Sequence, residues 1–254
     1  MNQPLTNKLA LVTGSSRGIG AAIAARLAAD GASVIVNYAA SPQRAAAVVD
    51  AIRKDGGAAE AVQADVSTAE GRKALIAASD QAFGGKFDGR LDILVNNAGT
   101  VEFGPFLEAK EGAYERHFDL NVRAVMELSH EAAKRMSKVG WGRIINIGSA
   151  FGEGVPLPGV AIYVGSKFAV NGFTRALSRE LGALGITVNG VQPGPVNTEM
   201  SPEDGPHAPL MISRTSVGRF GRVHEIAHAV AFLAHPHAAF VNGENINVDG
   251  GWLA

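Results

Sequence analysis

The stretch Leu9-Ala-Leu-Val-Thr-Gly-Ser-Ser-Arg-Gly-Ile-Gly20 decides the fold. Its first five residues form a short apolar run of the length expected for a buried strand in a parallel sheet. Glycines at 14, 18 and 20 break the run, and an alanine-rich helical segment follows as far as Asp30. A glycine-rich turn that opens a helix is a place where a pyrophosphate can lie on backbone amides. Three residues separate the first two glycines, so the turn departs from G-x-G-x-x-G, and its position after the first strand is what favours nucleotide binding.

The same alternation of strand and helix continues along the chain. We expect further strands at 33–37, 58–64, 91–95, 143–147, 186–191 and 245–248. Between them we expect helices at 41–56, 68–83, 108–138, 160–184 and 223–233, and one long irregular segment at 194–221. Unbroken alternation of this kind specifies a parallel sheet covered on both faces. The sequence therefore predicts an α/β fold, with residues 1–254 forming a single doubly wound Rossmann-like domain of seven parallel strands.

Composition excludes several classes of protein. The 254 residues are 46% apolar and 19% charged, and the formal net charge is −1, which gives no basic face for nucleic acid. There is no cysteine and hence no disulfide framework or thiolate metal site. The polar start, Met1 to Lys8, lacks the apolar core of a signal peptide, and no apolar run reaches the roughly 20 residues of a membrane span. We expect a cytoplasmic protein with no nucleic-acid or membrane partner.

The run Tyr163-Val-Gly-Ser-Lys167 brings a phenol and an ammonium together near the start of a helical segment. Residues four apart on a helix share one face, about 5–6 Å apart at their Cβ atoms. A nearby positive charge favours the phenolate, so we expect the pKa of Tyr163 to fall below its reference of about 10. A phenol tuned in this way can give a proton to a carbonyl oxygen or take one from an alcohol.

Taken in order, the motifs of the chain resemble those of the short-chain dehydrogenase/reductases. They are Thr13-Gly14-x-x-x-Gly18-Ile19-Gly20, Asn96-Asn97-Ala98-Gly99, Asn121, Ser149, Tyr163-x-x-x-Lys167, Pro193-Gly194 and Asp249-Gly250-Gly251. The likeness runs from about Lys8 to Gly251. It implies one Rossmann domain whose substrate pocket is built from the loops after the fourth, fifth and sixth strands.

The resemblance also implies catalytic roles. Tyr163 is the general acid of carbonyl reduction, and Lys167 lowers its pKa and holds the nicotinamide ribose. Ser149 polarises the substrate carbonyl, and Asn121 holds a water in a proton relay. These roles fit the chemistry, because an oxygen that gains negative charge during hydride transfer needs hydrogen-bond donors.

The cofactor is expected to be NADP(H), with NAD(H) as a possible substitute. The cofactor positions that the resemblance implies are Gly14, Ser16, Arg17, Gly18, Ile19, Gly20, Asn37, Ser41, Asp65, Val66, Asn97, Ala98, Gly99, Tyr163, Lys167, Pro193, Gly194, Val196 and Thr198. An NAD-selective enzyme of this fold carries an acid at the end of the second strand, and here no acid lies between that strand and Asp50 in the following helix. Arg17 can instead meet the 2′-phosphate as a bidentate donor, with Asn37 and Ser41 adding neutral hydrogen bonds.

The substrate is expected to be a medium-sized, partly apolar ketone or aldehyde. The pocket positions implied by the resemblance are mostly apolar: Val101, Phe103, Phe151, Val155, Leu157, Met200 and Met211. Reduction of a 3-oxoacyl group on a carrier protein is an alternative, as is an NAD-dependent sugar or alcohol dehydrogenase. An acidic carrier would favour a basic rim. The two rim stretches of the family read 139–141, Val-Gly-Trp, and 183–185, Ala-Leu-Gly, with Lys138 as the nearby charge. The loop at 152–159, between Ser149 and Tyr163, is long for the family.

His224-Glu225-x-x-His228 matches a zinc-peptidase signature, but the residues beyond it lack the glycine and the third histidine of the extended form, so we expect no metal. A nucleotide sensor without activity would be expected to lack Tyr163 or Lys167. The apolar helices at 108–138 and 160–184 pair between subunits in the family, which implies a homotetramer, with a dimer as the alternative.

Overall fold

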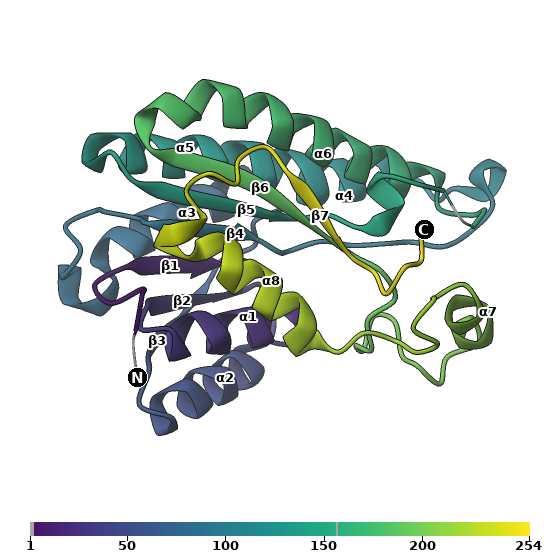
Figure 1. Ribbon diagram of the computed structural model, residues 1–254, viewed down its shortest axis with the longest axis horizontal. Helices are drawn as coiled ribbons and strands as arrows, with labels where there is room; N and C mark the ends of the chain where they lie inside the picture. Colours follow the sequence, from purple (N-terminus) through teal and green to yellow (C-terminus); the bar gives the residue numbers. More distant parts are fainter. Residues whose placement is uncertain (1–2, 156) are drawn as a thin grey trace.

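The computed structural model describes residues 3–155 and 157–254 and shows one twisted sheet of seven parallel strands (Figure 1). The strands lie in the order β3-β2-β1-β4-β5-β6-β7. Their bounds are β1 Leu9–Val12, β2 Ser33–Tyr38, β3 Ala58–Gln63, β4 Ile93–Asn96, β5 Gly142–Ile147, β6 Ile186–Pro193 and β7 Asn245–Val248. The predicted seven-stranded parallel sheet is therefore confirmed, and each observed strand overlaps its predicted range.

Helices cover both faces of the sheet, because successive side chains of a strand point to opposite faces. Ala10 and Val12 pack beneath α1 (Gly18–Ala29), α2 (Pro42–Lys54) and α8 (Val223–Ala234). Leu9 and Leu11 pack beneath α3 (Ala69–Gln81), α5 (Ala124–Val139) and α6 (Ala161–Leu181) on the opposite face. Both layers are visible above and below the sheet in Figure 1. A strand buried on both faces explains why β1 reads as an uninterrupted apolar run.

The order of the strands places the ligand site. β1 pairs with β2 on one side and with β4 on the other, so the chain reverses its direction of winding at β1. In an open α/β sheet the ligand lies beyond the carboxyl ends of the strands at such a reversal. The loops after β1, β2 and β4 therefore form the floor of the candidate site.

The helix predicted at 108–138 begins later than expected, at Ala113, and is interrupted instead of continuous. A short 3₁₀ turn, Phe106–Glu108, precedes a loop, and α4 (Ala113–Phe118) begins only after Gly112, which has a left-handed φ of 74°. A π-helical turn, Asp119–Arg123, then separates α4 from α5. The predicted irregular segment at 194–221 likewise contains a helix, α7 (Ala208–Ser213). Further 3₁₀ turns are Ala82–Gly85, Ala150–Gly152, Gly182–Leu184 and Pro236–Ala238.

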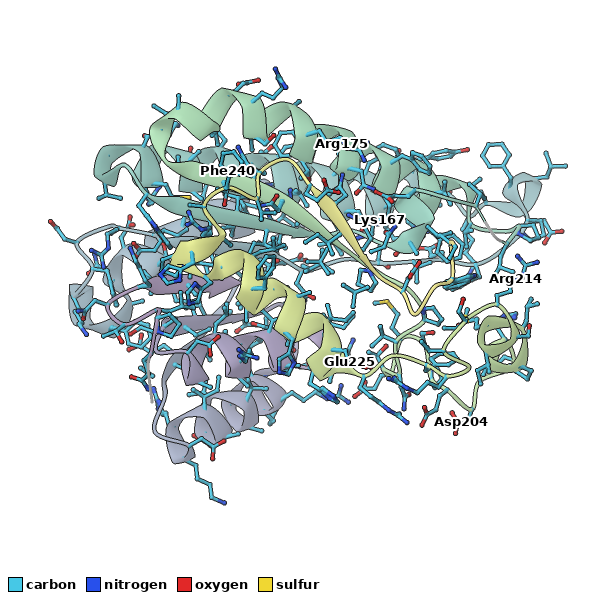
Figure 2. The ribbon with its side chains drawn as sticks, viewed as in Figure 1. Lys167, Arg175, Asp204, Arg214, Glu225 and Phe240 are labelled. Carbon is cyan, nitrogen blue, oxygen red and sulfur yellow. The ribbon has the colours of Figure 1, made fainter. Side chains whose placement is uncertain are left out.

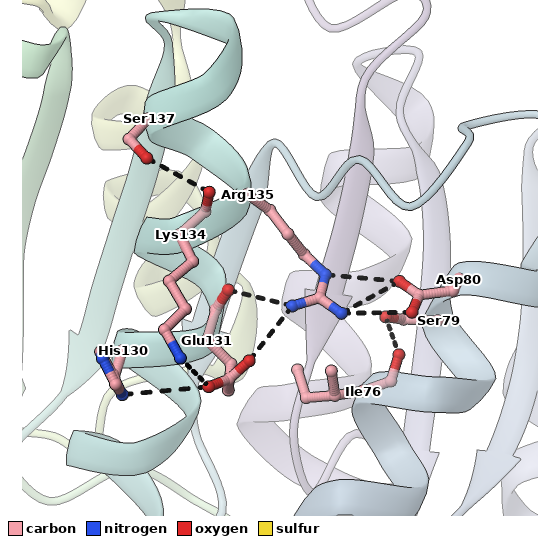
Figure 3. A network of polar contacts seen from close by, with 8 residues as sticks. All are labelled: Ile76, Ser79, Asp80, His130, Glu131, Lys134, Arg135 and Ser137. Atoms are coloured by element: carbon pink, nitrogen blue, oxygen red, sulfur yellow. Dashed lines mark hydrogen bonds and ion pairs between the residues drawn. The ribbon is translucent and has the colours of Figure 1, made fainter.

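A polar cluster ties α5 to α3 on the outer surface (Figure 3). The Arg135 guanidinium donates to both carboxylate oxygens of Asp80 at 3.2 Å and to the side chain of Glu131 one turn earlier at 3.4 Å. Arg72 of α3 donates to Glu127 of α5 at 2.6 Å. These ion pairs fix the lateral position of α5, which continues from the π-helical turn beside the site.

Candidate active site

A cavity of about 460 Å³ opens at the carboxyl ends of the strands. Every predicted cofactor position lines it, from the glycine turn after β1 to Thr198 after β6. The same cavity is also lined by Ser149, Tyr163 and Lys167. Residues from seven separate stretches of the chain are thus brought to one cavity, whose size falls within the usual range of ligand pockets.

The glycine turn is shaped for close approach. Gly14 and Gly18 have left-handed φ angles of 61° and 57°, which residues with side chains rarely adopt. A Cβ at Gly20 would lie 2.5 Å from Asn97 Nδ2 and 2.6 Å from the Gly14 carbonyl oxygen. Asn97 Nδ2 donates to the carbonyl oxygens of Thr13 and Gly14 at 2.9 and 3.1 Å, which locks this turn against the loop after β4. A bare backbone fixed in this way fits a pyrophosphate.

Asn37 holds the turn from beneath. Its Oδ1 accepts from Gly14 N at 3.2 Å, and its Nδ2 donates to the carbonyl oxygens of Ala64 and Val62 at 3.0 and 3.3 Å. The side chain is buried, and its hydrogen-bonding groups are engaged with backbone. Asn37 therefore positions the glycine turn, and the expectation that its amide adds a hydrogen bond to the 2′-phosphate does not fit these contacts.

Lys167 and Tyr163 lie on one face of α6, as their spacing predicts. The Lys167 ammonium is 5.7 Å from the centroid of the Tyr163 ring and donates to the Ile147 carbonyl oxygen at 3.0 Å. Figure 2 shows Lys167 in the interior of the molecule, and its burial lowers the pKa of Lys167 to about 8. Burial also raises the pKa of Tyr163, and a hydrogen bond with the Ser149 side chain opposes that rise. The predicted fall in the pKa of Tyr163 is thus wrong for these residues as they lie here, because desolvation is the larger effect.

Ser149 stands where β5 ends and is fixed through its backbone. Its amide donates to Gln192 Oε1 of β6 at 2.7 Å, and its own Oγ accepts from Phe151 N at 3.2 Å. Gln192 Nε2 donates in turn to Asn245 Oδ1 of β7 at 3.1 Å. Gln192 was not predicted from the sequence, although a glutamine inside a strand buried on both faces is a signal for such a network.

Asn121 lies in the π-helical turn, behind the cavity wall. Its Oδ1 accepts from Thr100 N and its Nδ2 donates to Thr100 O, both at 2.9 Å. The same Nδ2 donates to Ser166 Oγ at 3.0 Å, and that hydroxyl donates to the Tyr163 carbonyl oxygen at 2.7 Å. Asn121 therefore joins the loop after β4 to the helix that carries Tyr163. Single π-helical turns of this kind occur often at functional sites.

The apolar wall differs in part from the predicted one. Five of the seven expected positions line the cavity, namely Val101, Phe103, Phe151, Met200 and Met211. Leu157 instead packs behind them against the cluster around Phe151, and Val155 is 63% exposed. Trp252, which was not predicted, lines the cavity with its ring centroid 5.5 Å from that of Phe151. It lies only two residues from the end of the chain, where no periodic pattern marks it.

The two histidines of the possible zinc motif, His224 and His228, lie in the first two turns of α8. Glu225, at the start of α8 in Figure 2, accepts from the Arg222 amide at 2.7 Å and pairs with Arg219 at 2.8 Å. These bonds lower the pKa of Glu225 to about 2, which is unsuited to a general base. His228 Nδ1 lies 2.6 Å from the His224 carbonyl oxygen. Within the described ranges 3–155 and 157–254, no three histidine or acidic side chains gather as a metal site.

Comparisons with known proteins agree with this geometry. The family model described as short chain dehydrogenase matches residues 8–208. An uncharacterized oxidoreductase of Methylorubrum extorquens is 46% identical over 251 residues, covering 97% of this chain and 98% of its own. A 3-oxoacyl-[acyl-carrier-protein] reductase of Staphylococcus aureus is 40% identical over 247 residues, covering 96% and 97%. A solved short-chain dehydrogenase of Burkholderia cenocepacia in complex with NADP is 42% identical, with a TM-score of 0.92 and coverage of 99% and 100%. With its glycine turn, its Tyr163–Lys167 pair and these relatives, the chain belongs to the short-chain dehydrogenase/reductase family of oxidoreductases.

Proposed function

We propose that this oxidoreductase uses NADPH to reduce a ketone or aldehyde to an alcohol, reversibly. The observation that carries the proposal is the cavity itself, which is lined both by the glycine turn and by Ser149, Tyr163 and Lys167. A dinucleotide is long enough to join a phosphate-binding turn to a reacting centre across one cavity. When bound there, the nicotinamide supplies the hydride.

The side chains supply the proton and the electrostatic environment. Burial raises the pKa of Tyr163, so the phenol is protonated at neutral pH and can donate to a carbonyl oxygen. Ser149, hydrogen-bonded to Tyr163, provides a second hydroxyl beside the same oxygen. Two donors aimed at one oxygen stabilise the negative charge that develops as the carbonyl is reduced. Lys167 holds a proton behind Tyr163, and Asn121 fixes the helix that carries both residues.

The cofactor residues fit a dinucleotide with a 2′-phosphate. The turn at 14–20 exposes glycine backbone to the cavity, and β2 ends Val36-Asn37-Tyr38 without an acid. Arg17 lies at the cavity rim. The Burkholderia relative, solved with NADP, adds support from a protein of the same fold. We infer a preference for NADPH over NADH.

The substrate wall favours a partly apolar carbonyl compound. Its side chains include Phe151, Met200, Met211 and Trp252, and none carries a charge that would clamp a carboxylate. Reduction of a 3-oxoacyl carrier protein is the second candidate, since several relatives at about 40% identity carry that name. The two stretches expected at the pocket rim, 139–141 and 183–185, instead directly precede β5 and β6, so they lie at the amino-terminal edge of the sheet and do not line the cavity. That expectation was wrong, and these stretches do not help to choose between the two candidates.

A substrate panel tests the proposal. Purified protein is assayed with simple ketones, diketones, acyl thioesters and sugar alcohols, each with NADP(H) and NAD(H). We expect the highest kcat/KM for an apolar ketone or diketone with NADPH. A strong preference for acyl thioesters would favour the carrier-protein alternative, and oxidation of a sugar with NAD⁺ alone would favour the sugar dehydrogenase. No turnover with any pair would favour a nucleotide sensor.

Location and assembly are part of the same proposal. In the residues that the structure describes, no helix has both the length and the apolar character to cross a membrane. We propose that the chain acts in the cytoplasm, as a single domain that assembles into a homotetramer. Its partners would then be a small-molecule substrate, the dinucleotide and copies of itself.

A further inference from the structure

One carboxylate lies between two arginines at the rim of the cavity. Glu199 accepts from Arg44 Nη1 at 2.9 Å through Oε1 and at 2.7 Å through Oε2. Its Oε2 also accepts from Arg17 Nη1 at 3.4 Å. These bonds and the two positive charges lower the pKa of Glu199, so it is ionised at neutral pH. The three side chains carry a net charge of about +1.

The cluster joins three elements that are far apart in sequence. Arg17 belongs to the glycine turn after β1, and Arg44 belongs to the first turn of α2, after β2. Glu199 belongs to the segment after β6, which lies over the glycine turn, because Thr198 approaches to 3.7 Å from where a Cβ of Gly18 would be. β2 itself ends without an acid, so Glu199 brings a carboxylate to this corner from the other half of the chain.

The cluster matters more for ligand binding than for the stability of the fold. An exposed salt bridge contributes little to stability, and all three side chains here are 47–61% exposed. The guanidinium fork, however, matches carboxylate and phosphate oxygens equally well. Glu199 engages Nη1 of both guanidinium groups, so a phosphate must compete with it for these donors. A phosphate that does enter meets a carboxylate as well as two cations.

We propose that Arg44 and Arg17 together bind the 2′-phosphate of the cofactor, and that Glu199 competes with this phosphate for the same two guanidinium groups. Glu199 therefore weakens the binding of NADP(H) and leaves that of NAD(H) unchanged, so it sets how strictly the protein distinguishes the two. The inference rests on the proposed use of NADP(H). It adds one binding residue and one opposing residue that the motifs of the chain do not mark.

The test uses ligand fragments, because their binding does not depend on catalysis. Isothermal titration at fixed ionic strength measures the Kd of adenosine 2′,5′-bisphosphate and of 5′-AMP, which lacks the 2′-phosphate. We expect Arg44→Ala to weaken the bisphosphate about tenfold and Glu199→Gln to tighten it about fivefold, with the Kd of 5′-AMP within twofold in both variants. Titration with intact NADPH and NADH should give the same pattern.

Two matched variants control for the loss of charge. Asp204→Asn removes an exposed acid from the same segment as Glu199 (Figure 2), and Lys54→Ala removes a cation from the far end of α2, about 15 Å from Arg44 by helical rise. Neither should change the preference for the bisphosphate. Equal effects of these controls, or an unchanged bisphosphate Kd in Arg44→Ala or Glu199→Gln, would overturn the inference. Weaker 5′-AMP binding in Glu199→Gln would also overturn it, because the carboxylate would then serve a ribose hydroxyl. Since turnover plays no part in these titrations, such results would leave the proposed reduction chemistry standing.

Discussion

At the scale of single residues, the Tyr163 hydroxyl is the group whose removal separates chemistry from binding. Tyr163→Phe keeps the ring, which contacts Phe151 edge to face, and removes only the proton donor. We expect kcat to fall by about 10²–10⁴-fold, the usual contribution of a general acid. The Kd of NADPH, measured by fluorescence titration, should change less than twofold. Tyr114→Phe, on the half-exposed tyrosine of α4, is the control that should retain full turnover. A Tyr163→Phe enzyme with near-normal turnover would refute the assigned role.

Arg17 offers a second test at this scale, with cofactor affinity as the measurement. Arg17→Ala should weaken NADPH binding by about 1.5–3 kcal/mol, the range for a hydrogen bond to a charged group, and leave NADH binding nearly unchanged. Titration of both dinucleotides on one protein preparation gives the comparison directly. Equal losses for the two cofactors would show that Arg17 shapes the glycine turn and does not contact the phosphate.

Lys167 makes the stability of the fold depend on pH in a defined direction. Burial lowers its pKa from 10.5 to about 8, so between these values the unfolded chain binds a proton that the folded chain has released. Stability must therefore rise with pH across this window, and the shift corresponds to about 3 kcal/mol. Below pH 8 both states carry the proton and the unfavourable burial of charge is fully present.

The measurement compares two proteins at several pH values. Urea unfolding of the wild type and of Lys167→Met, from pH 7 to pH 10.5, isolates the contribution of the amine from other titrations. We expect the stability of the wild type relative to Lys167→Met to increase steadily between pH 8 and 10.5. A difference that stays constant with pH would show that folding does not lower the pKa of Lys167.

At the scale of elements, Gln192 of β6 connects the loop that carries Ser149 to β7. Gln192→Leu removes the acceptor for the Ser149 amide and the donor for Asn245, and both partners are buried. Leaving buried polar groups unsatisfied costs about 1–3 kcal/mol each, so we expect lower unfolding free energy in urea. Because Ser149 shifts, kcat should also fall more than the KM of the ketone rises.

Thr187, in the same strand, supplies the matched control. Its buried hydroxyl has no hydrogen-bond partner among the residues that the structure describes, so Thr187→Val removes a polar group without breaking a bond. We expect that variant to be as stable as the wild type, or more stable. If both substitutions destabilise the protein equally, the effect of Gln192 lies in packing and its hydrogen bonds are not responsible.

The same elements show which features could be predicted from the sequence. Strands buried on both faces, such as β1 and β4, read as apolar runs, and the glycine turn marks the ligand edge, so the fold and the cofactor cavity follow from local signals. The break between α4 and α5 did not, because a single π-helical turn of five residues is too short to show a period in the sequence. Arg44, Gln192, Glu199 and Trp252 were missed for a different reason. Each acts through a contact across many residues of sequence, which only the folded chain brings together.

At the scale of the whole molecule, exposed phenylalanine side chains lie in two separate places, on α4 and α6 and in the loop before β7. Phe118 of α4 and Phe168 of α6 are 41% and 45% exposed, and Phe118 lies 4.0 Å from where a Cβ of Gly165 would be. Phe240, in the loop before β7, is fully exposed and projects at the opposite end of the sheet from α7 (Figure 2). Large exposed apolar groups gathered on packed helices are typical of subunit interfaces.

The exposed phenylalanines of α4 and α6 and the separate Phe240 side chain favour two kinds of symmetric contact, and two perpendicular twofold contacts close a tetramer. We expect light scattering at micromolar concentration to give four times the 26.3 kDa chain mass. Phe168→Asp sets like charges against each other across a twofold axis at the α4–α6 surface, so it should give a dimer held by the surface around Phe240. Leu210→Asp, on the exposed face of α7, should remain a tetramer. A monomer mass for the unmodified chain would rule out the assembly, and a tetramer that survives Phe168→Asp would place the contact elsewhere.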